Sequence, residues 1–262
     1  MFSLEKAMQE MQAVARKVGA MQRENLGRLD LEMDRKTTSI DLVTEIDRRS
    51  DDMIVGYLRQ QYPEHAILAE ESGVSGQASE YRWVIDPVDG TTNYAQGLPI
   101  FAVSIALEHR GEKVLGIVYA PVTDEMFSAI KGQGSYRNGK RLQVGGKSEL
   151  IECVLATGFP YDIAIHPVNN IDYFTSLAKK TRAVRRMGSA AYDLACVASG
   201  GFDGFWEMNL SPWDVAASIL IVTEAGGEVL PFRDDRKISI VAANPVISRK
   251  ILAALREVDR LA

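Results

Sequence analysis

The fold is decided by one stretch of this sequence, Trp83-Val84-Ile85-Asp86-Pro87-Val88-Asp89-Gly90-Thr91-Thr92-Asn93-Tyr94. Its apolar first part predicts a strand that stops at Asp86 and therefore places a carboxylate at the strand's end. Pro87 restricts the backbone before Asp89, and Gly90 permits a tight turn. Thr91 then caps a new helix, whose free backbone N–H groups attract an anion. Carboxylates that face a phosphate need cations between them, so the stretch predicts a metal-assisted phosphate site.

Composition describes a soluble globular protein that is long enough to bury a sizeable core. The chain has 262 residues, of which 46% are hydrophobic and 25% are charged. A net charge of −5 argues against bulk binding of nucleic acid. Its two cysteines, Cys153 and Cys196, lie in apolar runs, which favours reduced thiols over a disulfide or a zinc site. Because no secretory signal or membrane-spanning run is evident, we expect a cytoplasmic protein without a membrane partner.

Hydrophobic periodicity predicts alternating helices and strands. Helices are expected over 2–26, over a segment that Thr44 caps with Asp47 at its third position, and over 168–178, 188–198, 212–225 and 247–261. Strands are expected over 66–69, 83–85, 101–107, 114–119, 126–130, 154–156, 183–187, 204–207, 229–230 and 238–242. A hairpin is expected over about 29–37, a polar loop over 72–80 and a tight turn at Asn138-Gly139.

This order of elements predicts a layered α/β fold of the mixed α+β kind, with a first half rich in antiparallel strands. A polar, glycine-bearing stretch over 142–150 separates two halves. We expect an N-terminal half, 1–145, to carry most metal ligands and the phosphate site. The C-terminal half, 146–262, is expected to complete the substrate pocket.

Acidic residues outside the opening stretch have ordinary structural explanations when each is taken alone. Glu70 and Glu71 end a strand, where an acid is usually solvated, and Asp214 begins an apolar helix, where an acid favours the helix dipole. Asp41 and Asp47 bracket a short apolar run and are both suited to capping.

Taken together, the acids predict a metal centre. Two Mg²⁺ ions that share one carboxylate would need about what Glu70, Asp86, Asp89 and Asp214 offer, together with one backbone carbonyl. The three histidines form no ligand pair, which favours a hard cation over zinc.

Five ordered blocks resemble the inositol monophosphatase family, within the magnesium-dependent, lithium-sensitive sugar phosphatases. The blocks are 83–94, 213–217 with 224–227, 41–47, 69–72 and 188–190. The resemblance covers essentially the whole chain. It implies a layered α/β/α/β/α sandwich that is commonly dimeric, so we expect a homodimer.

The resemblance also implies roles for individual residues. Implied metal ligands are Glu70, Asp86, Asp89, Asp214 and the carbonyl of Val88. Thr91, paired with Asp47, is implied to orient and deprotonate the attacking water, which Glu70 contacts through its metal. The backbone amides of Gly90 and Thr91 are implied to hold the phosphate, and Lys36 to lie near the site. Positions implied to bind substrate hydroxyls are Asp89, Ala190, Glu207 and Asp214.

The sequence leaves the substrate open. We expect a phosphomonoesterase acting on inositol 1-phosphate or a related polyol or sugar phosphate. Fructose 1,6-bisphosphate and histidinol phosphate are rivals, and a 3′-phosphonucleotide belongs among the substrates to be tested. Arg185 and Arg186 can hold a second phosphate, although solvated surface is an equal explanation for both. A different class of role, binding to the transcription machinery, is implied for some bacterial relatives. A passive divalent-ion protein is a third alternative.

Overall fold

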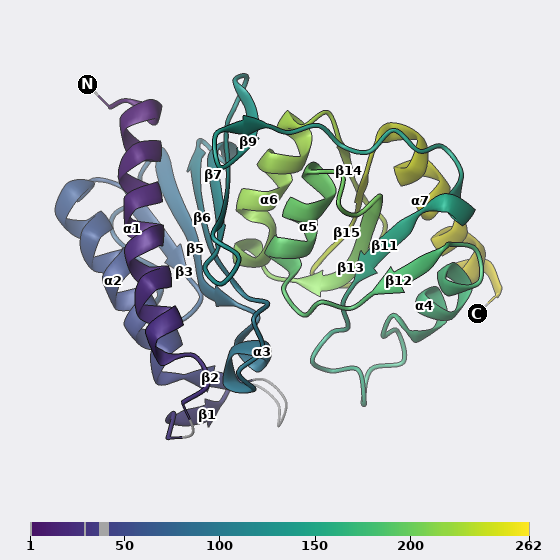
Figure 1. The fold of residues 1–262 in the computed structure, drawn as a ribbon, viewed down its shortest axis with the longest axis horizontal. Helices are drawn as coiled ribbons and strands as arrows, with labels where there is room; N and C mark the ends of the chain where they lie inside the picture. The colour runs from purple at the N-terminus through teal and green to yellow at the C-terminus, as the bar shows by residue number, and fades with distance from the viewer. Residues whose placement is uncertain (1, 29, 37–41, 262) are drawn as a thin grey trace.

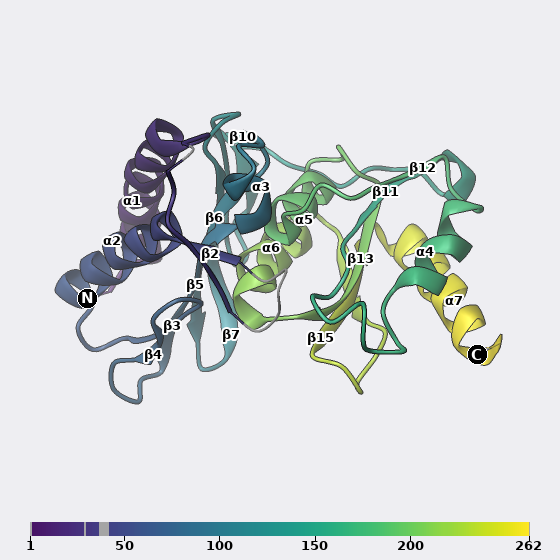
Figure 2. The ribbon, with the colours of Figure 1, turned by 90° about the horizontal axis from the view of Figure 1, so that it is seen from below.

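The computed structural model describes residues 2–28, 30–36 and 42–261, and their helices and sheets stack in layers (Figure 1). From left to right in Figure 1 the layers are α1 with α2, a large sheet, α5 with α6, a smaller sheet, and α4 with α7. The same succession is visible from below in Figure 2. This is the α/β/α/β/α sandwich that the sequence predicts, and the prediction is confirmed.

The outer helices of the N-terminal half are α1 (Leu4–Asn25) and α2 (Glu45–Gln61). The side chain of Ser3 caps α1 by accepting a hydrogen bond from the N–H of Lys6. Thr44 and Asp47 form a reciprocal capping box at the start of α2, as predicted. Both helices bury their apolar stripes against one face of the large sheet, in a cluster that includes Met11, Ile54 and Trp83.

The large sheet has eight strands in the order β10-β9-β8-β7-β6-β5-β3-β4. Their bounds are β3 (Ala66–Ala69), β4 (Gly73–Ser75), β5 (Tyr81–Asp89), β6 (Ala102–His109), β7 (Glu112–Ala120), β8 (Glu125–Ile130), β9 (Gly134–Arg137) and β10 (Lys140–Arg141). Only the β3–β5 pair is parallel among these neighbours. The short strands β1 (Met33–Arg35) and β2 (Leu42–Thr44) pair separately. The first half is thus rich in antiparallel strands, as expected.

The smaller sheet has five strands in the order β12-β11-β13-β15-β14. The C-terminal elements are η1 (Leu150–Glu152), β11 (Val154–Thr157), α4 (Ile171–Ala178), β12 (Ala183–Arg185), α5 (Ala190–Ala198), β13 (Gly204–Leu210), α6 (Pro212–Glu224), β14 (Glu228–Pro231), β15 (Ile238–Ala243) and α7 (Pro245–Leu261). The helices α5 and α6 lie between the two sheets and pack on both, for example through Phe127 and Phe205. The helices α4 and α7 cover the outer face of the smaller sheet.

The proposed division near residue 145 remains a prediction. Every strand of the large sheet precedes it and every strand of the smaller sheet follows it. The helices α5 and α6, however, bury apolar surface against the large sheet. The two halves therefore share one layer of core.

Several predicted boundaries were wrong, and the one at β5 matters for the site. The strand does not stop at Asp86 but continues to Asp89. Pro87 cannot donate to the ladder, and the register with β6 shifts between Asp86 and Asp89, where pairing resumes with Ala102. The cap of the next helix, α3 (Thr91–Ala95), is Gly90 with φ of 105°, not Thr91. The hydroxyl of Thr91 is therefore available for another role.

Other differences are smaller. The polar loop predicted over 72–80 contains the edge strand β4. The helix predicted from Val168 begins at Ile171. The hairpin predicted over about 29–37 was wrong: among the described residues only β1 lies in that range, and its partner is β2, beyond the predicted end. Asp41 lies outside the described residues. Within the described ranges, no helix is long and apolar enough to cross a membrane.

The close approach of α6 to β7 gives a test of the packing. A Cβ atom at Gly116 would lie 2.6 Å from the carbonyl oxygen of Ala217. We expect Gly116→Ala to lower the free energy of unfolding by about 1–3 kcal/mol through overpacking. Its thermal midpoint should fall by about 2–4 °C for each kcal/mol.

The matched control is Gly56→Ala in α2, where an added Cβ meets nothing within 4 Å. Removing a glycine from a helix interior should stabilise the protein by about 0.5–1 kcal/mol. Equal midpoints for the two variants would contradict the account of this interface.

Candidate active site

A cavity of about 690 Å³ lies where the end of β5 meets α5, α6 and β13. Its acidic lining residues are Glu70, Asp86, Asp89, Asp162, Asp193, Glu207 and Asp214, and its basic ones are Lys36, Arg186 and Lys237. Seven acidic side chains against three basic ones leave an excess of carboxyl groups in one cavity. Such a cavity favours positively charged ligands.

A second cavity, of about 460 Å³, lies between α4 and α7. There Arg233 forms ion pairs with Asp235 and Asp259. Because these charges are paired with one another, the first cavity is the stronger candidate for a functional site.

Asp86 and Asp89 reach the first cavity from the irregular end of β5. An oxygen of Asp86 accepts a hydrogen bond from the N–H of Val88 at 3.0 Å. The Oδ2 atom of Asp89 accepts from the hydroxyl of Ser189 at 2.7 Å and from the N–H of Ala191 at 2.6 Å. Asp89 thus belongs to the N-terminal half but caps α5 of the C-terminal half.

Glu70 is brought beside Asp86 by the parallel pairing of β3 with β5. Its N–H donates to the carbonyl of Ile85 at 3.1 Å, and its carboxyl lies close enough to that of Asp86 to add repulsion to the burial that raises the pKa of Asp86. The amino group of Lys36 bonds to Glu70 at 2.9 Å and also to Glu71. Burial lowers the pKa of Lys36, but the two glutamates outweigh it and raise that pKa above its usual range.

Asp214 has the helix-start role that the sequence suggested, and its predicted role as a metal ligand stays a prediction. It stands at the third position of α6, where its Oδ2 atom accepts from the N–H of Ser211 at 2.7 Å. It also lines the cavity. One acidic side chain can therefore cap a helix and line the cavity at the same time.

The carboxyls strongly disfavour one another's ionised forms. Burial, followed by repulsion from Glu70, Asp89 and Asp214, raises the pKa of Asp86 well above its usual range. Burial and repulsion from Asp89 do the same to the pKa of Asp214. Burial also raises the pKa of Glu70, against the attraction of Lys36, and raises that of Asp89 to about 6.

This donor set fits a hard divalent cation chemically, because every donor is an oxygen and their charges are unbalanced. Among the described residues, however, no group of three or more His, Cys, Asp or Glu side chains is already arranged to hold an ion. Glu70 is turned toward Lys36. The complete ligand set stays a prediction, and it requires side chains to reorient around the ion.

Thr91 and Asp47 meet behind the cavity wall. The hydroxyl of Thr91 donates to Oδ1 of Asp47 at 2.7 Å and lies 3.1 Å from the carbonyl of Val88. The other oxygen of Asp47 accepts from the N–H of Thr44 at 3.0 Å and from its hydroxyl. The capping box thus aims Asp47 at Thr91. Burial raises the pKa of Asp47 to about 6, although the hydrogen bonds from Thr44 and Thr91 lower it in part.

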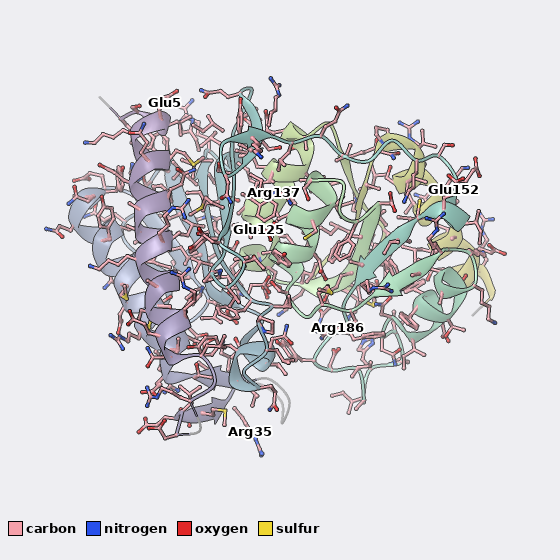
Figure 3. All side chains as sticks on the ribbon, in the orientation of Figure 1. Glu5, Arg35, Glu125, Arg137, Glu152 and Arg186 are labelled. Carbon is pink, nitrogen blue, oxygen red and sulfur yellow. The ribbon has the colours of Figure 1, made fainter. Side chains whose placement is uncertain are left out.

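Of the remaining predicted site residues, all but Arg185 line the cavity. Those that line the cavity are Val88, Gly90, Ala190, Glu207, Lys36 and Arg186. Glu207 packs against Gly158, where a Cβ would lie 2.1 Å from its Oε1 atom, and burial raises the pKa of Glu207 to about 8. Figure 3 labels Arg186 in the lower middle of the view, below the region of α5 and β13. Arg185 is exposed, does not line the cavity, and donates to the carbonyl of Val184.

Sequence reasoning missed Asp193 and Lys237, which also line the cavity. A signal existed for Asp193: it is a lone acid in the apolar first turns of a helix that follows a serine. Asp214 has the same setting after Ser211. No comparable pattern marks Lys237.

A sequence model of the "Inositol monophosphatase family" matches residues 4–260. The chain belongs to that family, whose members are generally metal-dependent, and it is a phosphatase.

Three relatives show how close the likeness is. The chain is 42% identical over 222 residues to an inositol-1-monophosphatase of Mesorhizobium japonicum, covering 83% of this chain and 84% of the relative. It is also 42% identical over 251 residues to the Nus factor SuhB of Pseudomonas aeruginosa, covering 92% and 93%. The crystal structure of the suppressor protein SuhB of Bartonella henselae superposes with a TM-score of 0.90 at 38% identity, covering 96% of this chain and 98% of that one.

The buried repulsion at Asp86 can be tested without an activity assay. When folding raises the pKa of a carboxyl, the folded protein becomes less stable as the pH rises and that carboxyl ionises. We therefore expect Asp86→Asn to raise the thermal midpoint at pH 8 in the presence of a chelator, by roughly 2–4 °C for each kcal/mol gained. Adding Mg²⁺ should then stabilise the original protein more than the variant.

A variant that is less stable than the original protein in chelator, or that responds equally to Mg²⁺, would contradict this account of Asp86. Asp52→Asn is the control, since Asp52 is exposed on α2. It should change neither measurement.

Proposed function

We propose that this enzyme is a Mg²⁺-dependent phosphomonoesterase whose substrate is inositol 1-phosphate or a related polyol or sugar phosphate. The observation that carries the proposal is the hydrogen bond from Thr91 to Asp47 beside a cavity with surplus carboxylates. Glu70, Asp86, Asp89, Asp214 and the carbonyl of Val88 would hold the metal. When bound, Mg²⁺ supplies positive charge that activates water and stabilises the phosphoryl and leaving oxygens.

Thr91 and Asp47 are proposed to accept the proton that the attacking water loses. The hydroxyl of Thr91 donates to Asp47, so its lone pairs face the cavity and accept a hydrogen bond from the attacking water. Asp47 then receives a proton through Thr91. A base whose pKa burial raises to about 6 is well matched to this task near neutral pH.

The phosphate is held at the turn before α3. N–H groups in the first turn of a helix have no partner within the helix, so those of Gly90 and Thr91 are suited to phosphate oxygens. Only glycine fits at position 90, because its φ is 105° and a Cβ would lie 3.1 Å from the carbonyl oxygens of Gly188 and Ile100. The backbone therefore closes tightly around this end of the site.

The polyol is expected on the opposite side, against the C-terminal half. Glu207 and Asp214 supply carboxyl groups there, and Ala190 supplies backbone at the start of α5. Asp89 lies between the two sides. Hydroxyl groups of a polyol can donate hydrogen bonds to these acceptors.

The rival substrates differ in whether they carry a second phosphate that Arg186 could bind. Because Arg185 lies outside the cavity lining, the pair proposed to hold a second phosphate is reduced to Arg186. A panel of inositol 1-phosphate, fructose 1,6-bisphosphate, histidinol phosphate and a 3′-phosphonucleotide, with released phosphate as the readout, separates them. We expect the highest kcat/KM for inositol 1-phosphate; a higher value for fructose 1,6-bisphosphate would reassign the substrate.

The general base gives the sharpest mechanistic prediction. Asp47→Asn keeps the size of the side chain but cannot take a proton. We expect kcat to fall by at least about 10²-fold, while Mg²⁺ still raises the thermal midpoint. Asp52→Asn on the same helix serves again as the control and should keep full activity. Retention of normal turnover by Asp47→Asn would refute the role of Asp47.

Metal dependence is tested directly by removal. Dialysis against a chelator should abolish phosphate release, and Mg²⁺ should restore it. Li⁺ is expected to inhibit the restored enzyme. Full activity after exhaustive chelation would refute a metal-dependent mechanism for this chain.

A second role, binding to the transcription machinery, is favoured by one observation, the similarity to a relative named a Nus factor. The net charge of −5 disfavours direct contact with RNA. Capture of RNA polymerase by a protein carrying both Asp86→Asn and Asp89→Asn would support a role independent of catalysis. Turnover of any phosphomonoester would dispose of the third alternative, a passive divalent-ion protein.

We also propose a cytoplasmic homodimer. The dimer is supported by the resemblance to the inositol monophosphatase family, whose members are commonly dimeric. Light scattering coupled to size exclusion should give twice the mass of the 28.9 kDa chain.

A further inference from the structure

One buried carboxyl in the cavity wall has no part in the function proposed above. Asp193 lies one turn into α5, is 1% exposed and lines the cavity. Its Oδ1 atom is buried and accepts no hydrogen bond. Buried polar atoms in native proteins are nearly always paired, so an unpaired one at a cavity points to a ligand.

A structural role does not explain Asp193. Asp203, a buried aspartate elsewhere in the same half, accepts hydrogen bonds from Lys147 at 2.8 Å and from the N–H of Val154 at 2.7 Å. Asp89 and Asp214 have similar backbone partners. The Oδ1 atom of Asp193, in contrast, is buried away from water and accepts no hydrogen bond in exchange.

Three charged residues from other segments line the same cavity and act electrostatically on Asp193. They are Glu207 on β13, Asp89 on β5 and Arg186 after β12. Two further carboxyls at this place repel an anion, so Asp193 is poorly placed to receive the phosphate. Uncharged donors suit it better, and the hydroxyl groups of a polyol are such donors.

We propose that Asp193 is a specificity-determining residue that accepts a hydrogen bond from a substrate hydroxyl and, with Glu207, selects polyol phosphates over monoesters without hydroxyl groups. The inference rests on the proposed function and deepens it by assigning the polyol side of the same site. A site built to bind a hydroxyl group rejects an analogue that lacks it, because its own polar group is left unpaired.

The test compares inositol 1-phosphate with cyclohexyl phosphate, which has the same ring size and no hydroxyl groups. The original protein should have the higher kcat/KM for inositol 1-phosphate. Asp193→Ala should lower that value by about 10-fold or more and change the value for cyclohexyl phosphate by less than about 2-fold. Asp193→Asn keeps one oxygen acceptor. Its kcat/KM for inositol 1-phosphate should lie between those of the original protein and Asp193→Ala, and its kcat/KM for cyclohexyl phosphate should be unchanged.

Stability measurements separate this role from a structural one. Asp193→Asn keeps the size of a buried side chain whose Oδ1 atom has no hydrogen-bond partner, and it should not lower the thermal midpoint. Asp203→Asn is the control: it should lower the midpoint without changing the ratio of the two kcat/KM values. Should Asp193→Ala fail to fold, Asp193→Asn still gives the selective loss or its absence.

Three results would overturn the inference: equal losses on both substrates, no loss on either, or an original protein without preference between them. In each of these the proposed phosphatase function survives, because turnover of inositol 1-phosphate is still measured. An original protein that hydrolyses neither ester would overturn the proposed function itself, and the inference with it.

Discussion

The site depends on one carboxylate, that of Asp89, which both ends β5 and caps α5. Because Ser189 and Ala191 bond to one of its oxygens, the start of α5 is fixed relative to the large sheet. A second contact at the same place comes from Asn93 in α3, whose amide donates to the carbonyls of Ile100 and Met187 at 2.7 Å. The cavity is therefore a product of how the two halves of the chain are joined.

Two other acids near the cavity also cap a helix. Asp47 and Asp214 each complete a capping box at a helix start. Asp47 also accepts a hydrogen bond from Thr91, and Asp214 also lines the cavity. Capping hydrogen bonds stabilise the ionised form of an acid, which partly offsets the burial and mutual repulsion that raise these pKa values. Helix capping thus lets the fold retain buried acids that would otherwise be costly.

Local sequence signals predicted much of this arrangement. The capping box at Thr44, the helix after Pro212 and the layered order of elements follow from periodicity and helix-start chemistry, and the structure confirms them. The family assignment was also correct, because five ordered blocks specify it better than any single motif.

What the sequence could not supply is long-range pairing. Pro87 marks a break, but β5 resumes its pairing at Asp89 because β6 lies beside it. Arg185 and Arg186 look equivalent in sequence, yet only Arg186 faces the cavity. Asp193 resembles an ordinary helix residue in the sequence, and only the fold brings it into one cavity with Glu207 and Asp89.

The central claim is that carboxylates from separate segments converge on divalent cations beside a bound phosphate. The most direct measurement is a crystal structure of the protein soaked with Mn²⁺ and inorganic phosphate, with the metal located by its anomalous scattering. The account predicts metal peaks about 2.1 Å from oxygens of Asp86 and Asp89, with the phosphate at the turn before α3. A cavity without metal, or metal bound elsewhere while these side chains stay apart, would contradict it.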